Sequence, residues 1–363
     1  MKRQHWGKAG GNRCREFTVN EPVSRVAVDA MGGDNGPGVI VQGAIEAVQR
    51  FPGIRIVLVG SEADIRPHLP PGAEKNLEVE IVHTSETIAM DESAPSVYRR
   101  RKDASVVVAT RLVAEHKVDA MVSAGNTGAV VTACLLGLGR IEGVLRPGIA
   151  TLVPTPTRHT VLVDVGANSD AKPIHLFQYA IMGRVYAQYV FDVENPKVGL
   201  LNIGEESSKG SELAQHAFRM LDDSREAIHF VGNVEGRDIL KGTADVVVCD
   251  GFTGNVILKF AESVVWMAVE TTRREMASNL KFKAGALLLR PLLHRLRNKL
   301  NYEEYGGAPL LGVNGVVVIA HGRSSAKAIM NAVRVAARGG RERIDQKIKE
   351  ELAREQRGEE AAG

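Results

Sequence analysis

Cysteine is scarce in this sequence of 363 residues, which contains three, Cys14, Cys134 and Cys249. They are widely spaced and form no C-x-x-C pair, which argues against a disulfide framework and against a zinc site. Unpaired cysteines are typical of a reducing compartment, so we expect a cytoplasmic protein. We expect neither a metal ion nor another cofactor.

Charge of one sign is not in large excess either, since Lys and Arg number 46, Asp and Glu number 43, and the formal net charge is +3. This balance argues against a general nucleic-acid binder. No run of about 18 uncharged apolar residues occurs, so no segment is expected to cross a membrane. Residues 1–24 hold no apolar run long enough for a signal peptide, and we interpret them as a flexible leader.

The common catalytic motifs are missing as well. The chain has no G-x-S-x-G, no H-E-x-x-H, no EF-hand loop, no G-x-G-x-x-G and no loop ending in Gly-Lys-Ser/Thr. Cys134, in the run VVTACLLGLG, and Cys249, at the end of DVVVC, are interpreted as core thiols. The histidines His83, His175 and His321 are interpreted as structural hydrogen-bonding groups, with only His321 kept as a candidate. A covalent mechanism therefore has no strong candidate.

Short apolar and β-branched runs alternate along the chain with amphipathic helical stretches. Many of these runs are apolar throughout, which is typical of strands buried between helices on both faces of a largely parallel sheet. The sequence predicts a doubly wound α/β fold in one domain over residues 25–340, followed by a charged helical tail, 341–363, that frays into solvent. The predicted strands are 25–30, 54–60, 77–84, 118–125, 148–155, 160–167, 197–204, 228–234, 244–251 and 315–322.

Gly stands with Asn, Asp, Thr or Ser where several of these strands end. The loops read DAMGGDNG, SAGNTGA, DVGANSD, NIGEESSKG, GNVEGRD and CDGFTGN. Each alone is typical of an ordinary turn. Ligands of open α/β sheets bind outside the carboxyl ends of the strands, and helix N-termini attract anions, so these loops together predict a convergent polar cleft for an anion.

These loops, with the segments VAVDAMGGDNGP, DAKPIHLFQYAIMG, GLLNIGEESSKG, ADVVVCDGFTGNV and YGGAPLLG, closely resemble the phosphate acyltransferase (PlsX) family of bacterial phospholipid synthesis. The resemblance covers about residues 26–337 and implies a fold similar to the isopropylmalate dehydrogenase and phosphotransacetylase group. It implies transfer of an acyl group from acyl-(acyl-carrier-protein) to inorganic phosphate, giving acyl phosphate. A homodimer is expected, with the downstream glycerol-3-phosphate acyltransferase as a further partner.

Direct attack of phosphate on the thioester suits these residues. Phosphate is a fair nucleophile near neutral pH, and a thiol with a pKa of about 8.5 leaves without much protonation. The site therefore has mainly to hold charge and to orient the reacting atoms.

Lys209 in NIGEESSKG is the predicted phosphate-binding cation, because it follows a strand and precedes a helix; the alternative is a solvated lysine. Asn233 is a predicted donor and Glu235 a predicted proton carrier. Carboxylates such as Asp34 and Asp250 are expected to orient loops, since they repel phosphate. The remaining predicted phosphate and substrate residues are Gly32, Gly33, Asp34, Asn126, Thr127, Asn168, Lys172, Asp250, Thr253 and Asn255, together with Arg99, Arg100 and Lys102 in DESAPSVYRRRKDAS, where Pro95 is displaced by one position from the family pattern.

The segment KFKAGALLLRPLLHRLRNKL combines a leucine stripe with basic flanks and has no acidic residue. Such a helix is typical of proteins that lie on anionic membranes, and it is predicted to form part of a projecting hairpin over about residues 254–305. The alternative is a dimer interface with a solvated basic face. The predicted membrane contacts are Leu289, Leu292, Leu293, Leu296, Arg295 and Arg297.

Two other function classes stay open at this point. A non-catalytic membrane scaffold for lipid synthesis would explain the hairpin but not the many polar loops. A nicotinamide-dependent dehydrogenase of similar fold is disfavoured because the G-x-G-x-x-G loop is missing.

Overall fold

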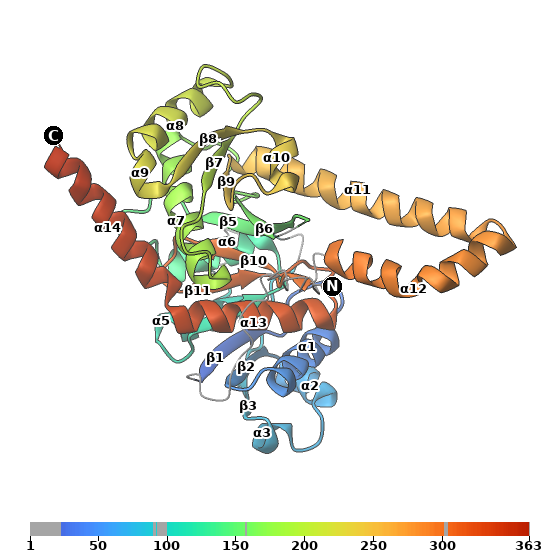
Figure 1. The fold of residues 1–363 in the computed structure, drawn as a ribbon. Coiled ribbons are helices and arrows are strands. Elements are labelled where there is room, and N and C mark those ends of the chain that lie inside the picture. Colours follow the sequence, from blue (N-terminus) through green and yellow to red (C-terminus); the bar gives the residue numbers. More distant parts are fainter. Residues whose placement is uncertain (1–22, 90–91, 93–99, 157, 301–303, 363) are drawn as a thin grey trace, which may run out of the picture.

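The computed structural model describes residues 23–89, 92, 100–156, 158–300 and 304–362. Its centre is an 11-stranded sheet with the order β3-β2-β1-β4-β11-β10-β5-β6-β9-β7-β8, from which a long helical hairpin projects (Figure 1). The strands are β1 Ser24–Asp29, β2 Ile54–Gly60, β3 Val79–His83, β4 Ala120–Ser123, β5 Gly148–Pro154, β6 His159–Val163, β7 Val198–Leu201, β8 Phe230–Val234, β9 Val246–Val248, β10 Ala308–Leu311 and β11 Val316–Ile319.

Helices cover both faces of the sheet, which confirms the doubly wound α/β prediction. Val26 and Val28 of β1 join one apolar cluster with α1 and α13, whereas Ala27 between them faces α5 and α6 on the other side. This alternation is the two-residue period of a strand buried on both faces. The helices are α1 Pro37–Arg50, α2 Glu62–Ile65, α3 Ala73–Asn76, α5 Ser105–Ala114, α6 Thr127–Gly137, α7 Pro173–Phe191, α8 Glu212–Asp223, α9 Arg225–Ile228, α10 Gly236–Lys241, α11 Gly251–Ala277, α12 Leu280–Leu300, α13 Ala326–Glu342 and α14 Ile344–Ala362.

One strand, β10, was not predicted from the sequence. It is four residues long, begins after two glycines and contains Pro309. Proline cannot donate to a sheet and normally argues against an internal strand. β10 nevertheless lies inside the sheet, antiparallel to both β11 and β5.

The C-terminal segment is helical as predicted, but its first part does not fray into solvent. Ile344, Ile348 and Leu352 of α14 are buried in the core beside α7. Arg184 of α7 forms an ion pair with Glu351 of α14. The folded unit therefore extends past the predicted limit at residue 340, because apolar residues at helical spacing lie within the charged segment.

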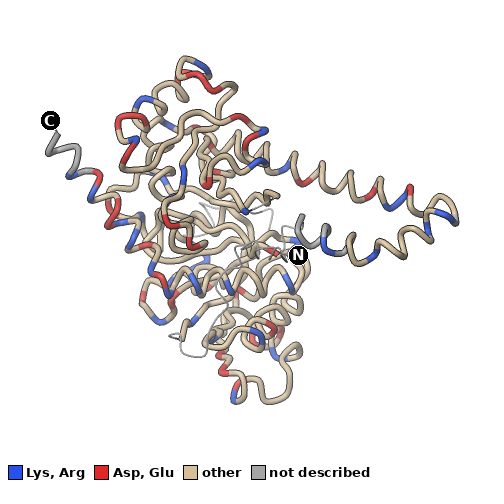
Figure 2. The backbone as a smooth tube through the Cα atoms, in the orientation of Figure 1, with Lys and Arg blue, Asp and Glu red and all other residues tan. Residues whose placement is uncertain are grey.

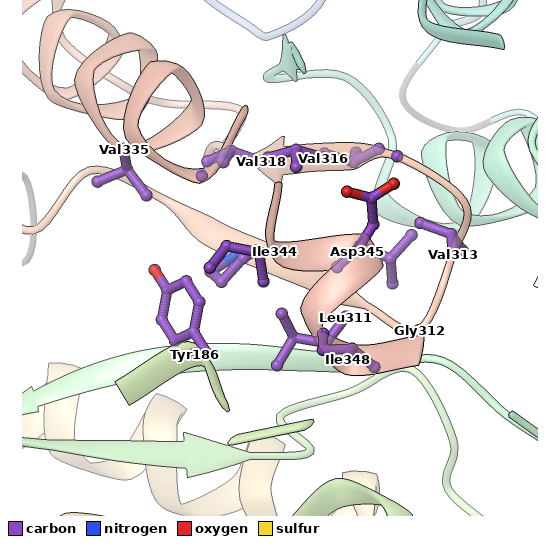
Figure 3. A pocket seen from close by; sticks show the side chains of 15 residues that line it. Tyr186, Leu311, Gly312, Val313, Val316, Val318, Val335, Ile344, Asp345 and Ile348 are labelled. Atoms are coloured by element: carbon purple, nitrogen blue, oxygen red, sulfur yellow. The ribbon is translucent and has the colours of Figure 1, made fainter. Parts of the chain in front are cut away.

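A small cavity of about 20 Å³ lies between α13, α14, β10 and β11. Figure 3 shows the side chains that line it, among them Tyr186, Val335, Ile344 and Ile348. The space is about that of one water molecule, and its lining is mainly apolar. It is a packing gap in the core and not a substrate site.

The projecting hairpin consists of α11 and α12. Among the residues of α11, Gly251 and Gly254 in its first turn are the buried ones. Helix α11 is long and apolar enough to cross a membrane by length and composition, which the sequence pattern did not predict because charged residues interrupt it. Figure 2 shows basic residues along α12 without acidic ones.

Candidate active site

The carboxyl ends of the strands do not meet at one edge of the sheet. β10 pairs antiparallel with β11 and β5, and β5 pairs antiparallel with β6, so the two parallel blocks of the sheet run in opposite directions. The loops after β1 and β4 form a first loop group, and the loops after β6, β7, β8 and β9 form a second loop group. The single convergence expected from the sequence is therefore wrong in that form.

In the first loop group the backbone is tightly packed. A Cβ atom on Gly32 would lie 2.6 Å from the backbone N of Gly125, and Gly33 has φ +98°. Beneath this turn the Asp29 carboxylate accepts the Ser123 hydroxyl at 2.7 Å, and burial raises the pKa of Asp29. Gly32 and Gly33 thus serve close packing between two loops.

The other predicted residues of the first loop group lie around this turn. Asp34 is 3.9 Å from Arg323, and the Asn126 Oδ1 caps α6 by accepting the Ala129 N–H at 2.9 Å. Arg99 lies outside the described residues. The exposed members of the predicted set here are Thr127, Arg100 and Lys102.

In the second loop group, Asp164 organises the loop after β6. One carboxylate oxygen accepts three backbone N–H groups at 3.0, 3.1 and 2.9 Å, and the other accepts that of Asn168 at 2.8 Å. The Asn168 amide donates to the Pro147 carbonyl at 2.6 Å and to the Tyr179 hydroxyl at 2.7 Å. Because these bonds use the amide hydrogens inside the protein, Asn168 holds the loop in place.

Helix α11 begins against this loop. The Asp250 carboxylate accepts the Thr253 N–H at 2.9 Å and its hydroxyl at 2.6 Å. A Cβ atom on Gly254 would lie 1.9 Å from the Asp164 carbonyl oxygen, so only glycine permits this approach. Asp250 and Thr253 therefore satisfy each other, whereas Asn255 is exposed.

Lys209 lies in the loop between β7 and α8. The Asn202 amide closes this loop by donating to the Lys209 carbonyl at 3.1 Å. A Cβ atom on Gly204 would lie 3.2 Å from the Lys209 Cγ, so this glycine makes room for the lysine. Lys209 is exposed and forms no ion pair with the described residues. A cation ahead of a helix N-terminus is unfavourable unless an anion binds beside it.

Asn233, at the end of β8, lies next to this loop. Its amide nitrogen donates to the Glu206 carbonyl at 2.9 Å. Its Oδ1 is buried and accepts no hydrogen bond within the described chain. A buried acceptor without a donor fits a ligand that carries a hydroxyl or an N–H. Glu235, the predicted proton carrier, instead pairs with Arg237 at 3.1 Å.

Sequence reasoning missed Arg146 as a site residue and treated His175 as structural. Arg146 precedes Pro147, whose carbonyl binds Asn168, and Lys172 and His175 stand at the start of α7. Arg146 and Lys172 are exposed and form no ion pair with described residues. Both charges act on His175. Nothing in the sequence around Arg146 indicates this, because the fold alone brings it to α7.

Neither described thiol is suited to be a nucleophile. Cys134 and Cys249 are buried. Burial raises the pKa of Cys134 to about 12 and that of Cys249 well above its ordinary value. Thiolate is the reactive form, so both side chains are inert near neutral pH.

Comparison with known proteins identifies the family. The family model described as "Fatty acid synthesis protein" matches residues 24–347. The phosphate acyltransferase of Heliobacterium modesticaldum is 53% identical over 332 residues, which cover 90% of this chain and 97% of that protein. The chain belongs to the phosphate acyltransferase family. The phosphate acyltransferase of Brevibacillus brevis is 46% identical over 336 residues, covering 92% of this chain and 99% of that protein. The resemblance read from the loop motifs is confirmed, and the protein is an acyltransferase of lipid synthesis.

Solved structures agree with this fold. A phosphotransacetylase from Streptococcus pyogenes matches with a TM-score of 0.60 at 16% identity, covering 88% of this chain and 94% of that one. The EutD phosphotransacetylase from Staphylococcus aureus matches with a TM-score of 0.56 at 16% identity and the same coverage. At this identity the likeness supports the α/β fold alone.

Proposed function

We propose that the protein transfers a fatty acyl group from acyl-(acyl-carrier-protein) to inorganic phosphate, giving acyl phosphate for phosphatidic acid synthesis. The observation that carries the proposal is Lys209, an exposed cation without an ion-pair partner ahead of helix α8, beside the unsatisfied Oδ1 of Asn233. A phosphate dianion neutralises the lysine, and its hydroxyl hydrogen is a donor that the Asn233 oxygen lacks.

Direct attack by phosphate follows from the state of the thiols. Since the described cysteines are buried and protonated, the acyl group passes to phosphate without an acylated cysteine. The basic charges of the second loop group raise the local concentration of phosphate and attract an acidic carrier protein.

The proposal is tested by incubating the protein with palmitoyl-(acyl-carrier-protein) and labelled phosphate and assaying for labelled acyl phosphate. Omission of the protein and replacement of phosphate by sulfate are the controls. Turnover distinguishes an enzyme from a scaffold, and absence of labelled product would refute the proposal.

Replacing Cys134 and Cys249 together by Ala tests direct attack. We expect most of the activity to persist, with a packing loss of a few kcal/mol at worst, because neither thiol takes part in the chemistry. Rates should be normalised to folded protein measured by circular dichroism. Mass spectrometry that detected an acylated cysteine in the unsubstituted enzyme would contradict direct attack.

The hairpin extends the proposal to a homodimer in peripheral contact with an anionic membrane. On α11, Phe252, Val256 and Phe260 are exposed at intervals of four residues, which marks an apolar stripe that a second copy can cover. On α12, the exposed Leu289 and Leu292 accompany basic side chains such as Arg295. Delivery of acyl phosphate at a membrane would suit a downstream glycerol-3-phosphate acyltransferase. The side chains of Leu296 and Arg297 lie outside the described residues.

Changing Leu289 and Leu293 to Glu should release the protein from phosphatidylglycerol vesicles at any salt concentration. Each fully buried leucine contributes roughly 1.5 to 3 kcal/mol, and each basic residue about 1 kcal/mol near an anionic surface. Changing Arg295 and Arg297 to Glu should weaken binding most at low salt, where screening is least. Sedimentation with vesicles measures both effects.

Leu240→Glu is the matched control for this experiment, because Leu240 is an exposed leucine on α10, outside the hairpin. It should leave vesicle binding unchanged. If the doubly substituted leucine variant still sediments with vesicles as a folded dimer, the leucines form a protein–protein surface and the membrane proposal is wrong.

A further inference from the structure

The ring of His175 has different surroundings at its two nitrogens. Its Nδ1 accepts the backbone N–H of Lys172 at 3.1 Å, across the first turn of α7. In a neutral imidazole the acceptor nitrogen carries no proton, so the proton lies on Nε2. The residue is 6% exposed, and its Nε2 neither bonds to a described residue nor is among the sealed polar atoms. A fixed donor is therefore available to a ligand.

The neighbouring charges keep this ring neutral. Burial lowers the pKa of His175, and Arg146 and Lys172 lower it further, against the opposing effect of Asp170. The Tyr179 hydroxyl, one turn further along α7, is already bonded to Asn168. Near pH 7 the His175 side chain thus offers one hydrogen, from Nε2, beside two cations without ion-pair partners among the described residues.

We propose that His175 is a catalytic residue that donates a hydrogen bond from Nε2 to the thioester carbonyl oxygen during acyl transfer. This inference rests on the proposed function and adds a residue to it. The loop after β6, which leads to His175, and the loop after β7, which carries Lys209, are separated by the single strand β9. Neighbouring strands lie about 4.8 Å apart, so these strand ends are roughly 10 Å apart, and bound phosphate and thioester can lie between them.

The step balances without a cofactor. An anionic oxygen of HPO4 2− forms a bond to the thioester carbon, and the carbonyl π electrons move to the oxygen that His175 holds. The carbonyl then re-forms, the C–S bond breaks, and the electron pair leaves on sulfur. The phosphate proton is released to solvent, and the thiolate takes up a proton, so the products are acyl phosphate and a thiol.

A neutral donor suits this role. It stabilises the oxyanion where charge develops, and it holds its own proton firmly, so that the tetrahedral intermediate expels the thiolate. A histidine that polarises a substrate carbonyl can likewise be kept neutral by a helix N-terminus, as in triosephosphate isomerase. Here the Lys172 N–H and the two neighbouring cations have the same effect on His175.

Two substitutions separate catalysis from a structural role. An Asn side chain can replace Nδ1 as acceptor of the Lys172 N–H but cannot reach the Nε2 position, whereas a Gln amide nitrogen can. His175→Asn should keep the fold and lower kcat by at least about 100-fold, the effect of losing one oxyanion donor, with KM for phosphate nearly unchanged. His175→Gln should retain at least about a tenth of the wild-type kcat.

The assay uses the full-length protein with palmitoyl-(acyl-carrier-protein) and labelled phosphate, with circular dichroism as the check on folding. Wild-type activity in the Asn variant, or equal losses of kcat in both variants, would overturn the role of Nε2. Absence of turnover by the unsubstituted protein would instead refute the proposed function, and this inference with it.

Discussion

Lys209→Ala is expected to lower the rate of acyl transfer at least about tenfold and to leave the fold intact. The side chain is exposed, packs over Gly204 and has no ion-pair partner among the described residues, so its removal opens no cavity. What is lost is the positive charge beside the bound phosphate, whose charge-assisted hydrogen bonds are among the stronger ones in proteins. Steady-state rates at varied phosphate concentration measure the effect.

Two further variants make this result specific. Lys209→Arg keeps the charge and should retain part of the activity. Lys75→Ala, which removes an exposed lysine of α3, should have no effect. An unchanged rate for Lys209→Ala would place the phosphate-binding cation elsewhere, first among Arg100, Lys102 and Lys172.

Gly254→Ala is expected to produce the largest loss of stability of any single methyl group discussed here. The added Cβ would lie 1.9 Å from the Asp164 carbonyl oxygen and 3.0 Å from the Cys249 Sγ. The first contact is with backbone, which cannot rotate away, so α11 has to shift. We expect a loss of about 3 kcal/mol or more in the free energy of unfolding, measured by urea denaturation.

Gly285→Ala is the control for this prediction. Gly285 lies within helix α12, and a Cβ atom there would meet no atom within 4 Å. Alanine is the better helix former, so this variant should be unchanged or slightly more stable. If Gly254→Ala unfolded at the same urea concentration as the wild type, α11 would not be held against the loop of Asp164.

The sequence was sufficient for the strands with a strong local pattern and insufficient where tertiary contacts decide. The predicted run 54–60 coincides with β2, because β-branched residues bounded by turns specify such a strand locally. β10 escaped because Pro309 opposes it and only pairing with β5 and β11 makes it a strand. The buried residues of α14 escaped because charged residues surround Ile344, Ile348 and Leu352.

The same division holds for the candidate site. The Gly- and Asn-rich loops were recognisable because turn residues at strand ends form a local pattern, and they revealed the family. The roles of the side chains were less accessible. Asn168 looks like a substrate donor in the sequence, yet Pro147 and Tyr179 use its amide hydrogens. Arg146 and His175 gain a shared environment only when β5 and α7 come together.

The position of β11 has a consequence for synthesis of the chain on the ribosome. β11 lies between β4 and β10, and α13 packs against β1 and β4. The first parallel block, which includes the earliest strands to be made, therefore cannot close until residues 308–342 have emerged. The block of β5, β6, β9, β7 and β8 is continuous in sequence and has no such wait. During translation the N-terminal strands consequently expose the edge of β4 longest, and chaperones would bind there first.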